Sequence, residues 1–225
     1  MKKILAFILA AFMLLAAVAC TANTTPTDPK SDTTDNNTDV PAVTMTAQEI
    51  LDSLKKSLGS SWASDTAETE DRMSGYYGLD MSQIESWAAE SNSMSSLNMD
   101  CAVVLQVKDG YAEDAAKLLQ QSFEQVLSYA RMYDMDLQRV LQARLFVNGN
   151  YVALLIEGEQ GDWNASAEEQ AKFAADEVAK VDAAWNEIFG SAENSIVIPE
   201  DSGNVNMDDD SEEELNPDDE FILGG

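Results

Sequence analysis

Hydrophobic residues recur at intervals of three and four in three segments of the chain, a spacing that predicts amphipathic helices. The segments are residues 47–58, 113–131 and 167–189. A Ser or Thr followed three residues later by Glu starts the first and third helices as a capping box, and Gly190 ends the third. The side chains expected to face inward are Ile50, Leu51, Leu54, Leu58, Ala115, Leu119, Phe123, Val126, Ala130, Ala174, Val178, Val181, Trp185 and Ile188.

Two other parts of the chain are rich in apolar and β-branched residues, which predicts strands. Residues 102–107 form one strand, which ends at the turn sequence Asp109-Gly110. Residues 144–147 and 150–156 form a hairpin whose two-residue type I′ turn is Asn148-Gly149. Because 150–156 is almost entirely apolar, we expect it in the centre of a sheet.

Weaker patterns complete the domain. Asp80-Met81-Ser82-Gln83 opens a short helix toward Trp87, and residues 88–95 are a further strand candidate. The order is then helix, short helix, strand pair, helix, hairpin and helix. This order predicts a single α+β domain over residues 46–190, with a mainly antiparallel sheet and helices packed on one face.

The segments on either side of this domain have the composition of disordered chain. Residues 20–45 are rich in Thr, Asp, Asn and Pro and predict a tether. Residues 191–225 carry twelve acidic side chains and no basic one, which predicts an extended acidic tail. One alternative stays open within this tail: the apolar run 195–198 adds an edge strand before Pro199 ends it.

Residues 1–19 have two lysines, then a short apolar run, then Ala16-Ala17-Val18-Ala19, an order typical of a secretory signal peptide. Cys20 follows directly, and the sequence around it resembles the lipobox of bacterial lipoproteins. This resemblance implies cleavage before Cys20 and acylation of its thiol, which would hold the mature chain on the extracytoplasmic face of the cell membrane. The alternative is an ordinary cleaved signal, with Cys20 incidental and the product secreted.

The chain is strongly acidic, with 13 basic and 41 acidic residues and a formal net charge of -28. Such a charge is repelled by nucleic acid phosphates and anionic lipid, so we expect neither as a partner and assign membrane attachment to the anchor alone. Besides Cys20 the chain has one other cysteine, Cys101, inside the apolar run 101–105. We expect a buried core residue there, not a reactive thiol.

Several of these segments occur together in a recognisable order. Tyr76-Tyr77-Gly78-Leu79-Asp80 precedes the Ser-Met segment 93–97, a strand then ends in Val107-Lys108-Asp109, and the hairpin 146–152 follows a long helix. This arrangement resembles a family of bacterial extracytoplasmic lipoproteins known as domain of unknown function 4358. The resemblance implies a domain at about residues 46–190 after an anchor and tether. It brings no catalytic residue, ligand or partner.

Carboxylates are the main candidates for chemistry, because the sequence contains no histidine. Glu157, Glu159 and Asp162 lie close in sequence beside Trp163, a set that a glycosidase could use. Our interpretation is instead a solvated loop whose tryptophan packs on the sheet edge. The tail sequence 204–210 has oxygen ligands at alternate positions, but Asp and Leu occupy the sixth and twelfth places, where an EF-hand needs Gly and Glu.

The aromatic and methionine residues between positions 62 and 99 have two readings, either core packing or the lining of a ligand cleft. We therefore expect no catalytic residue, no metal site and no cofactor. The leading hypothesis is a non-catalytic binding or accessory module at the bacterial cell surface, whose protein or small-molecule partner is unknown. The alternative is a carboxylate-dependent enzyme that acts on envelope polymers.

Overall fold

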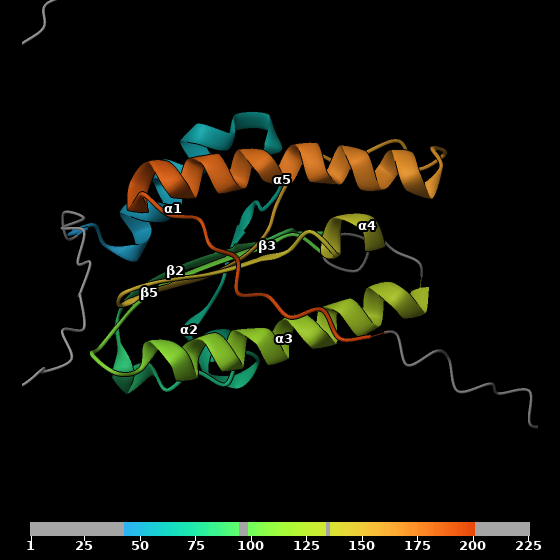
Figure 1. Ribbon diagram of the computed structural model, residues 1–225. Coiled ribbons are helices and arrows are strands. Elements are labelled where there is room, and N and C mark those ends of the chain that lie inside the picture. The colour runs from blue at the N-terminus through green and yellow to red at the C-terminus, as the bar shows by residue number, and fades with distance from the viewer. Residues whose placement is uncertain (1–42, 95–98, 134–135, 201–225) are drawn as a thin grey trace, which may run out of the picture. The chain divides into compact units, whose positions relative to one another are not determined.

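The computed structural model describes residues 43–94, 99–133 and 136–200 (Figure 1). The expected signal peptide, Cys20, most of the tether and the acidic tract after residue 200 lie outside these ranges. The helices are α1 Ala47–Leu58, α2 Glu70–Gly75, α3 Ala112–Tyr133, α4 Leu137–Val140 and α5 Ala167–Phe189, with 3-10 turns η1 Gly59–Ser61 and η2 Met81–Gln83. The strands are β1 Thr66–Ala67, β2 Ile84–Ser91, β3 Cys101–Val107, β4 Arg144–Asn148 and β5 Tyr151–Ile156.

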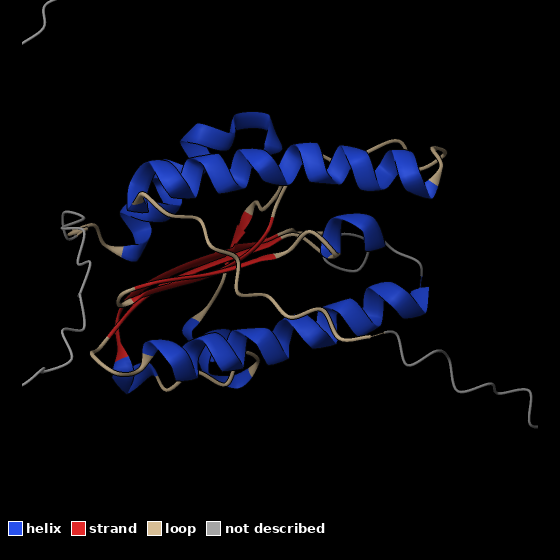
Figure 2. Ribbon diagram, viewed as in Figure 1, coloured by secondary structure: helices blue, strands red, loops and turns tan. Residues whose placement is uncertain are grey.

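The strands form one antiparallel sheet in the order β1-β2-β3-β5-β4 (Figure 2). The α+β class and the antiparallel sheet are confirmed, and β5 is central as expected. The expectation of helices on one face is wrong, because α1 and α5 cover one face while α2 and α3 cover the other, and α4 lies at the end of the sheet between α3 and α5 (Figure 1). The reason is that β3 and β5 are apolar on both sides, so both sides must be covered.

Alternate side chains of the central strands enter two separate cores. Cys101, Val103, Leu105 and Val107 of β3 face α3, together with Val152, Leu154 and Ile156 of β5. Ala102 and Val104 of β3 face α1 and α5, with Tyr151, Ala153 and Leu155 of β5. We refer to the two sides as the α3 face and the α5 face. Cys101 is buried and free as expected, and burial raises the pKa of its thiol.

The three predicted amphipathic helices are confirmed. Both capping boxes form, at Thr46 with Glu49 and at Ser166 with Glu169, and Gly190 ends α5 with a left-handed backbone (φ 70°). Most of the expected inward side chains are buried. Val126 and Ile188 are only partly buried, because Leu127 and Phe189 beside them take the fully buried positions.

The expected short helix from Asp80 toward Trp87 is wrong. The side chain of Asp80 accepts from the Ser82 backbone N–H at 2.9 Å and caps only the single turn η2. Strand β2 then begins at Ile84, earlier than the expected residue 88, and Trp87 lies in it opposite Leu105 of β3. Pairing along all of β3 thus overrides the helix start signal.

The β4–β5 hairpin is confirmed, but its turn lies one residue further along. Asn148 pairs with Tyr151, so the two loop residues are Gly149 and Asn150. Gly149 has φ 59° while Asn150 does not have positive φ, which is the pattern of a type II′ turn rather than type I′. Asn148 stays in the strand because its side-chain oxygen accepts from Trp185 Nε1 at 2.7 Å.

The expected domain boundary at residue 190 is also wrong, because residues 191–200 lie against the sheet and α3. Asn194 bridges to Phe146 on β4, and the Ser195 N–H donates to the Leu145 carbonyl at 2.8 Å. Ile196 packs on the core of the α3 face, while Gln120 of α3 exchanges hydrogen bonds of 2.7 and 3.0 Å with the Val197 backbone. These contacts make a strap across the edge of β4, although only an isolated bridge forms and not the alternative edge strand.

No helix within the described ranges is long and apolar enough to cross a membrane.

Candidate functional site

Two buried acids meet at one end of the central strands. Cys101 of β3 pairs with Ile156 of β5, so Asp100, just before β3, and Glu157, just after β5, flank the same end of an antiparallel pair. Asp100 is 2% exposed and Glu157 is 4% exposed. Carboxylates are rarely buried without partners, so two buried acids make this strand end the candidate functional site.

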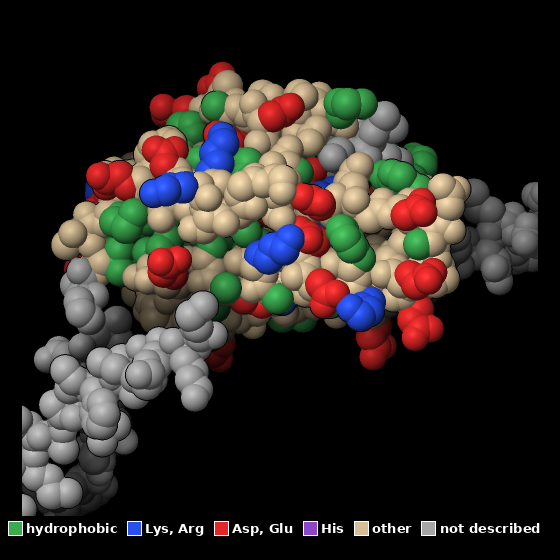
Figure 3. All heavy atoms as spheres, turned by 90° about the horizontal axis from the view of Figure 1, so that it is seen from above, with side chains coloured by type: hydrophobic (Ala, Val, Ile, Leu, Met, Phe, Trp, Pro, Cys, Tyr) green, Lys and Arg blue, Asp and Glu red, His purple; other side chains and the backbone are tan. Residues whose placement is uncertain are grey.

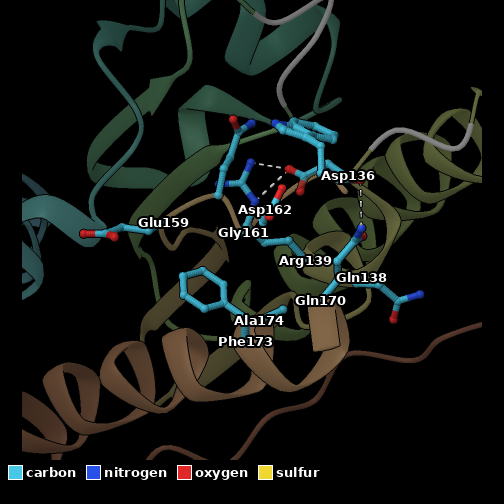
Figure 4. A pocket seen from close by; sticks show the side chains of 11 residues that line it. Asp136, Gln138, Arg139, Glu159, Gly161, Asp162, Gln170, Phe173 and Ala174 are labelled. Atoms are coloured by element: carbon cyan, nitrogen blue, oxygen red, sulfur yellow. Dashed lines mark hydrogen bonds and ion pairs between the residues drawn. The ribbon is translucent and has the colours of Figure 1, made fainter. Parts of the chain in front are cut away.

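Arg139 neutralises the first of these acids. Its guanidinium forms ion pairs with Asp100 and Asp136, and its Nη1 donates to the Gly158 carbonyl at 2.7 Å. Figure 4 shows the bonds between Arg139 and Asp136. Burial disfavours the charged guanidinium, but the two carboxylates outweigh burial and raise the pKa of Arg139, which therefore stays charged.

Backbone geometry brings these groups together. Asp136, just before α4, has the left-handed φ of 54°, the one such value at a described residue other than glycine. Gly158 has φ 143°, and a Cβ there would lie 3.0 Å from Glu177 Cβ of α5, so a side chain would not fit. The absence of a side chain lets the Gly158 carbonyl reach Arg139.

Glu157 is held by a separate set of donors. It accepts from the backbone N–H groups of Ala63 and Ser64, at 2.7 and 3.4 Å, and from the Ser64 hydroxyl. Burial, together with the nearby charge of Asp100, raises the pKa of Glu157 to about 8 despite these bonds. The carboxyl is therefore largely protonated at neutral pH.

A shallow hollow lies outside these buried groups, between α4, the loop 159–163 and the first turns of α5 (Figure 4). Its volume is about 30 Å³, which is the share of one water molecule. Trp163 lines it and is 57% exposed, so the expectation that Trp163 packs on the sheet edge is wrong. The loop turns outward at Asp162, whose side chain accepts from the Asn164 backbone N–H at 2.9 Å.

The three acids proposed as a glycosidase set are not brought together. Glu157 lies in the interior, while Glu159 and Asp162 line the outer hollow. Glycoside hydrolysis requires two carboxyl groups that flank the substrate. Here the buried pair, Asp100 and Glu157, is engaged by Arg139 and Ser64, and neither acid lines the hollow. The exposed side of the site therefore consists of Trp163 with Glu159 and Asp162, apart from the two buried acids.

The sequence interpretation missed the Asp100–Arg139–Asp136 cluster. Two signals were available, namely the three-residue spacing of Asp136 and Arg139 and the position of an acid directly before an all-apolar strand. The aromatic and methionine residues between positions 62 and 99 are divided between the cores and a cavity. Tyr76, Tyr77 and Met99 line a second cavity on the α3 face, whereas Trp62 and Trp87 pack against the two cores.

Acidic side chains are spread over the face formed by α1 and α5, with few basic ones among them (Figure 3). Within the described ranges, no group of three His, Cys, Asp or Glu side chains is arranged to hold a metal ion. Comparisons with protein-family models, with curated proteins and with solved structures found no match to this chain.

Proposed function

We propose that this chain is an extracytoplasmic lipoprotein, attached to the membrane through Cys20, whose domain binds a partner without altering it chemically. The observation that supports this proposal is the division of the strand-end site. Its buried acids are engaged by Arg139 and Ser64, while an exposed tryptophan faces outward. Exposed aromatic side chains bordered by polar groups are typical of binding surfaces.

The surroundings of Trp163 indicate what kind of partner would suit it. Glu159, Asp162 and Asp136 line the same hollow, and the one basic side chain there, Arg139, is buried in ion pairs. The whole chain carries a net charge of -28. A partner with basic or neutral groups is favoured over an anionic one.

One observation favours the alternative, an enzyme acting on envelope polymers. A carboxyl with a pKa of about 8, as at Glu157, is suited to donate a proton at neutral pH. For that role Glu157 would have to reach a substrate, and at present Ser64 and Ala63 occupy both of its oxygens. We therefore keep catalysis as the second candidate.

Photo-crosslinking in intact cells tests the binding function. A photoreactive phenylalanine derivative replaces Trp163, and the matched control replaces Tyr129, an aromatic residue on α3 that is also exposed. We expect a discrete adduct from position 163 and none from position 129. Adducts of equal yield from both positions would contradict a binding surface at Trp163.

The catalytic alternative is tested with purified cell-wall polymer and the purified protein. We expect no soluble fragments to be released by the wild type. Release that disappears in Glu157→Gln would replace the binding proposal with the enzyme. The exposed control Glu187→Gln, on α5, should behave as wild type in either case.

Cys20→Ser tests the anchor, because lipoprotein processing needs the acylated thiol. We expect the variant to accumulate as an uncleaved precursor and to incorporate no labelled fatty acid. A mature mass identical to that of the wild type would show that an ordinary signal peptidase processes the chain, and the lipoprotein proposal would fail.

A further inference from the structure

The α3 face contains a cavity of about 170 Å³ that is separate from the Trp163 hollow. Asp100 borders this cavity, while its partner Arg139 borders the hollow. An engineered protein cavity of about 150 Å³, lined by apolar side chains, is large enough to bind benzene. This cavity is open on one side, and a concave, largely apolar hollow of this kind is the usual form of a small-molecule site.

The walls of the cavity would suit an apolar body. Leu154 of β5 and Cys101 of β3 form the inner wall, and Val126 of α3 and Met99 line it as well. Tyr76 is 37% exposed and the Arg72 side chain 44% exposed, so these two residues mark the open end.

Three hydroxyl groups that line the cavity, those of Tyr76, Tyr77 and Ser91, form no hydrogen bond among the described residues, and Tyr77 is the most buried of the three residues. Tyr77 is 4% exposed, and its hydroxyl forms no hydrogen bond with any residue in the described ranges. Burial raises the pKa of Tyr77, so the hydroxyl keeps its proton and can donate. Its oxygen is not among the fully buried polar atoms without a partner, so it is accessible from the cavity and free to donate to a ligand there.

The charged groups around the cavity are already paired. Arg72 Nε lies 3.0 Å from Glu68 Oε1, and its guanidinium is 4.4 Å from the Tyr76 ring centroid. Asp100 is held by Arg139. A charged ligand would have to compete with these pairs, whereas an uncharged one would not.

We propose that this cavity binds a small uncharged molecule with a ring-sized apolar body and one oxygen that accepts a hydrogen bond from Tyr77. The inference rests on the proposed binding function, to which it adds a ligand class. It does not depend on the partner of Trp163 or on the anchor.

The probes are benzyl alcohol and toluene, which share the ring and differ in the hydroxyl group. The protein is the chain from residue 20 to 225 with Cys20→Ser, because both cores lie between residues 43 and 200. Dissociation constants are measured by ligand-observed NMR. We expect benzyl alcohol to bind roughly fivefold more tightly than toluene, the usual net effect of one hydrogen bond.

Tyr77→Phe should remove this preference, so that benzyl alcohol binds as weakly as toluene while toluene is unaffected. Tyr129→Phe makes the same chemical change on the exposed surface of α3 and should leave both constants unchanged. Val126→Phe places a ring in the cavity and should abolish binding of both probes.

Three results would overturn the inference. The first is no saturable binding of either probe, which would leave the cavity to water. The second is tighter binding of benzoate or benzylamine than of benzyl alcohol, which would assign the cavity to charged ligands. The third is an unchanged preference for benzyl alcohol in Tyr77→Phe. A missing Trp163 adduct with intact cavity binding would instead count against the proposed function alone.

Discussion

The two faces of the sheet are filled in different ways. On the α5 face, Trp185 stacks between Phe146 and Phe189, with ring centroids 4.8 and 4.3 Å apart, and its indole N–H is satisfied by Asn148. On the α3 face, the sheet contributes mainly aliphatic side chains, a 170 Å³ cavity remains, and the buried Asp100–Arg139 pair lies at one end. Stacked aromatic rings thus fill one face, whereas the other keeps an open cavity even though it contains Phe123 and Tyr77.

The difference suggests different roles for the two faces, one in holding the sheet rigid and the other in binding. A face with stacked rings and satisfied polar groups is rigid and costly to disturb. A face that contains a cavity forgoes some packing contacts and the stability that they would provide. Cavities and perturbed ionisable groups are typical of ligand-binding sites. The stacked rings of the α5 face therefore hold the sheet in shape, while the cavity lies on the α3 face and the Trp163 hollow lies at the strand end, between α4 and the start of α5.

The largest expected effect comes from removing the central ring of the closed face. Trp185 is fully buried, so Trp185→Ala should cost about 3–5 kcal/mol in the free energy of unfolding. Val126→Ala, beside the existing cavity, should cost only about 1 kcal/mol, because few contacts are lost. Urea denaturation measures both. Equal losses would mean that the two faces are packed equally well.

The next effect is a pH dependence that arises at the strand end. The pKa of Glu157 is about 8 in the folded chain, above its ordinary value of 4.5. Its protonation thus stabilises the fold fully below pH 4.5, and this contribution is lost as pH rises to about 8, by up to about 1.4 kcal/mol per pH unit. Glu157→Gln should flatten the fall in unfolding free energy over this window. The exposed control Glu187→Gln should not, and parallel curves for wild type and Glu157→Gln would contradict the raised pKa.

Features fixed by neighbours in sequence were predictable. Both capping boxes, the glycine at the end of α5 and the hairpin follow from local patterns. The hairpin's one-residue error arose because Asn148-Gly149-Asn150 contains two possible turn pairs, and the bond from Trp185 to Asn148 decides between them. Helices on both faces of the sheet could also have been predicted, because a strand as apolar as 150–156 must be covered on both sides.

The candidate site was harder to predict because it depends on strand pairing. Asp100 and Glu157 become neighbours only through the register of β3 with β5. Arg139 joins them through the left-handed backbone at Asp136 and the side-chain-free Gly158. The spacing of Asp136 and Arg139 and the acid before β3 are visible in the sequence, but neither reveals which strands and loops come together. The cavity exists because the side chains around it do not fill the space between the sheet and the helices. A hydrophobic pattern shows which residues face inward but not how well they pack.

The smallest expected effect concerns the strap 191–200, which seals the edge of the α3 face. Asn194 accepts from the Leu145 N–H at 2.9 Å and donates to the Ala143 carbonyl at 3.2 Å, and Ile196 covers part of the core. Ending the chain after Gly190 exposes these groups to water. We expect a loss of about 1–3 kcal/mol, the sum of a few net hydrogen bonds and one partly buried side chain.

A chain that ends after Glu200 is the matched control for this truncation. It keeps every strap contact, including the bond of 2.9 Å from Arg131 Nη2 to the Pro199 carbonyl, and lacks only the acidic tract. Its unfolding free energy should equal that of the full chain or exceed it slightly at low salt, where the repulsion between tract and domain is least screened. Because the strap packs on the α3 face, ending the chain after Gly190 should also raise the dissociation constant of benzyl alcohol. The near-ultraviolet circular dichroism of the Trp185 stack on the α5 face should stay unchanged. Equal stability of the two truncated chains would show that the strap contributes nothing to the α3 face, and the contrast between the faces would then rest on the sheet and helices alone.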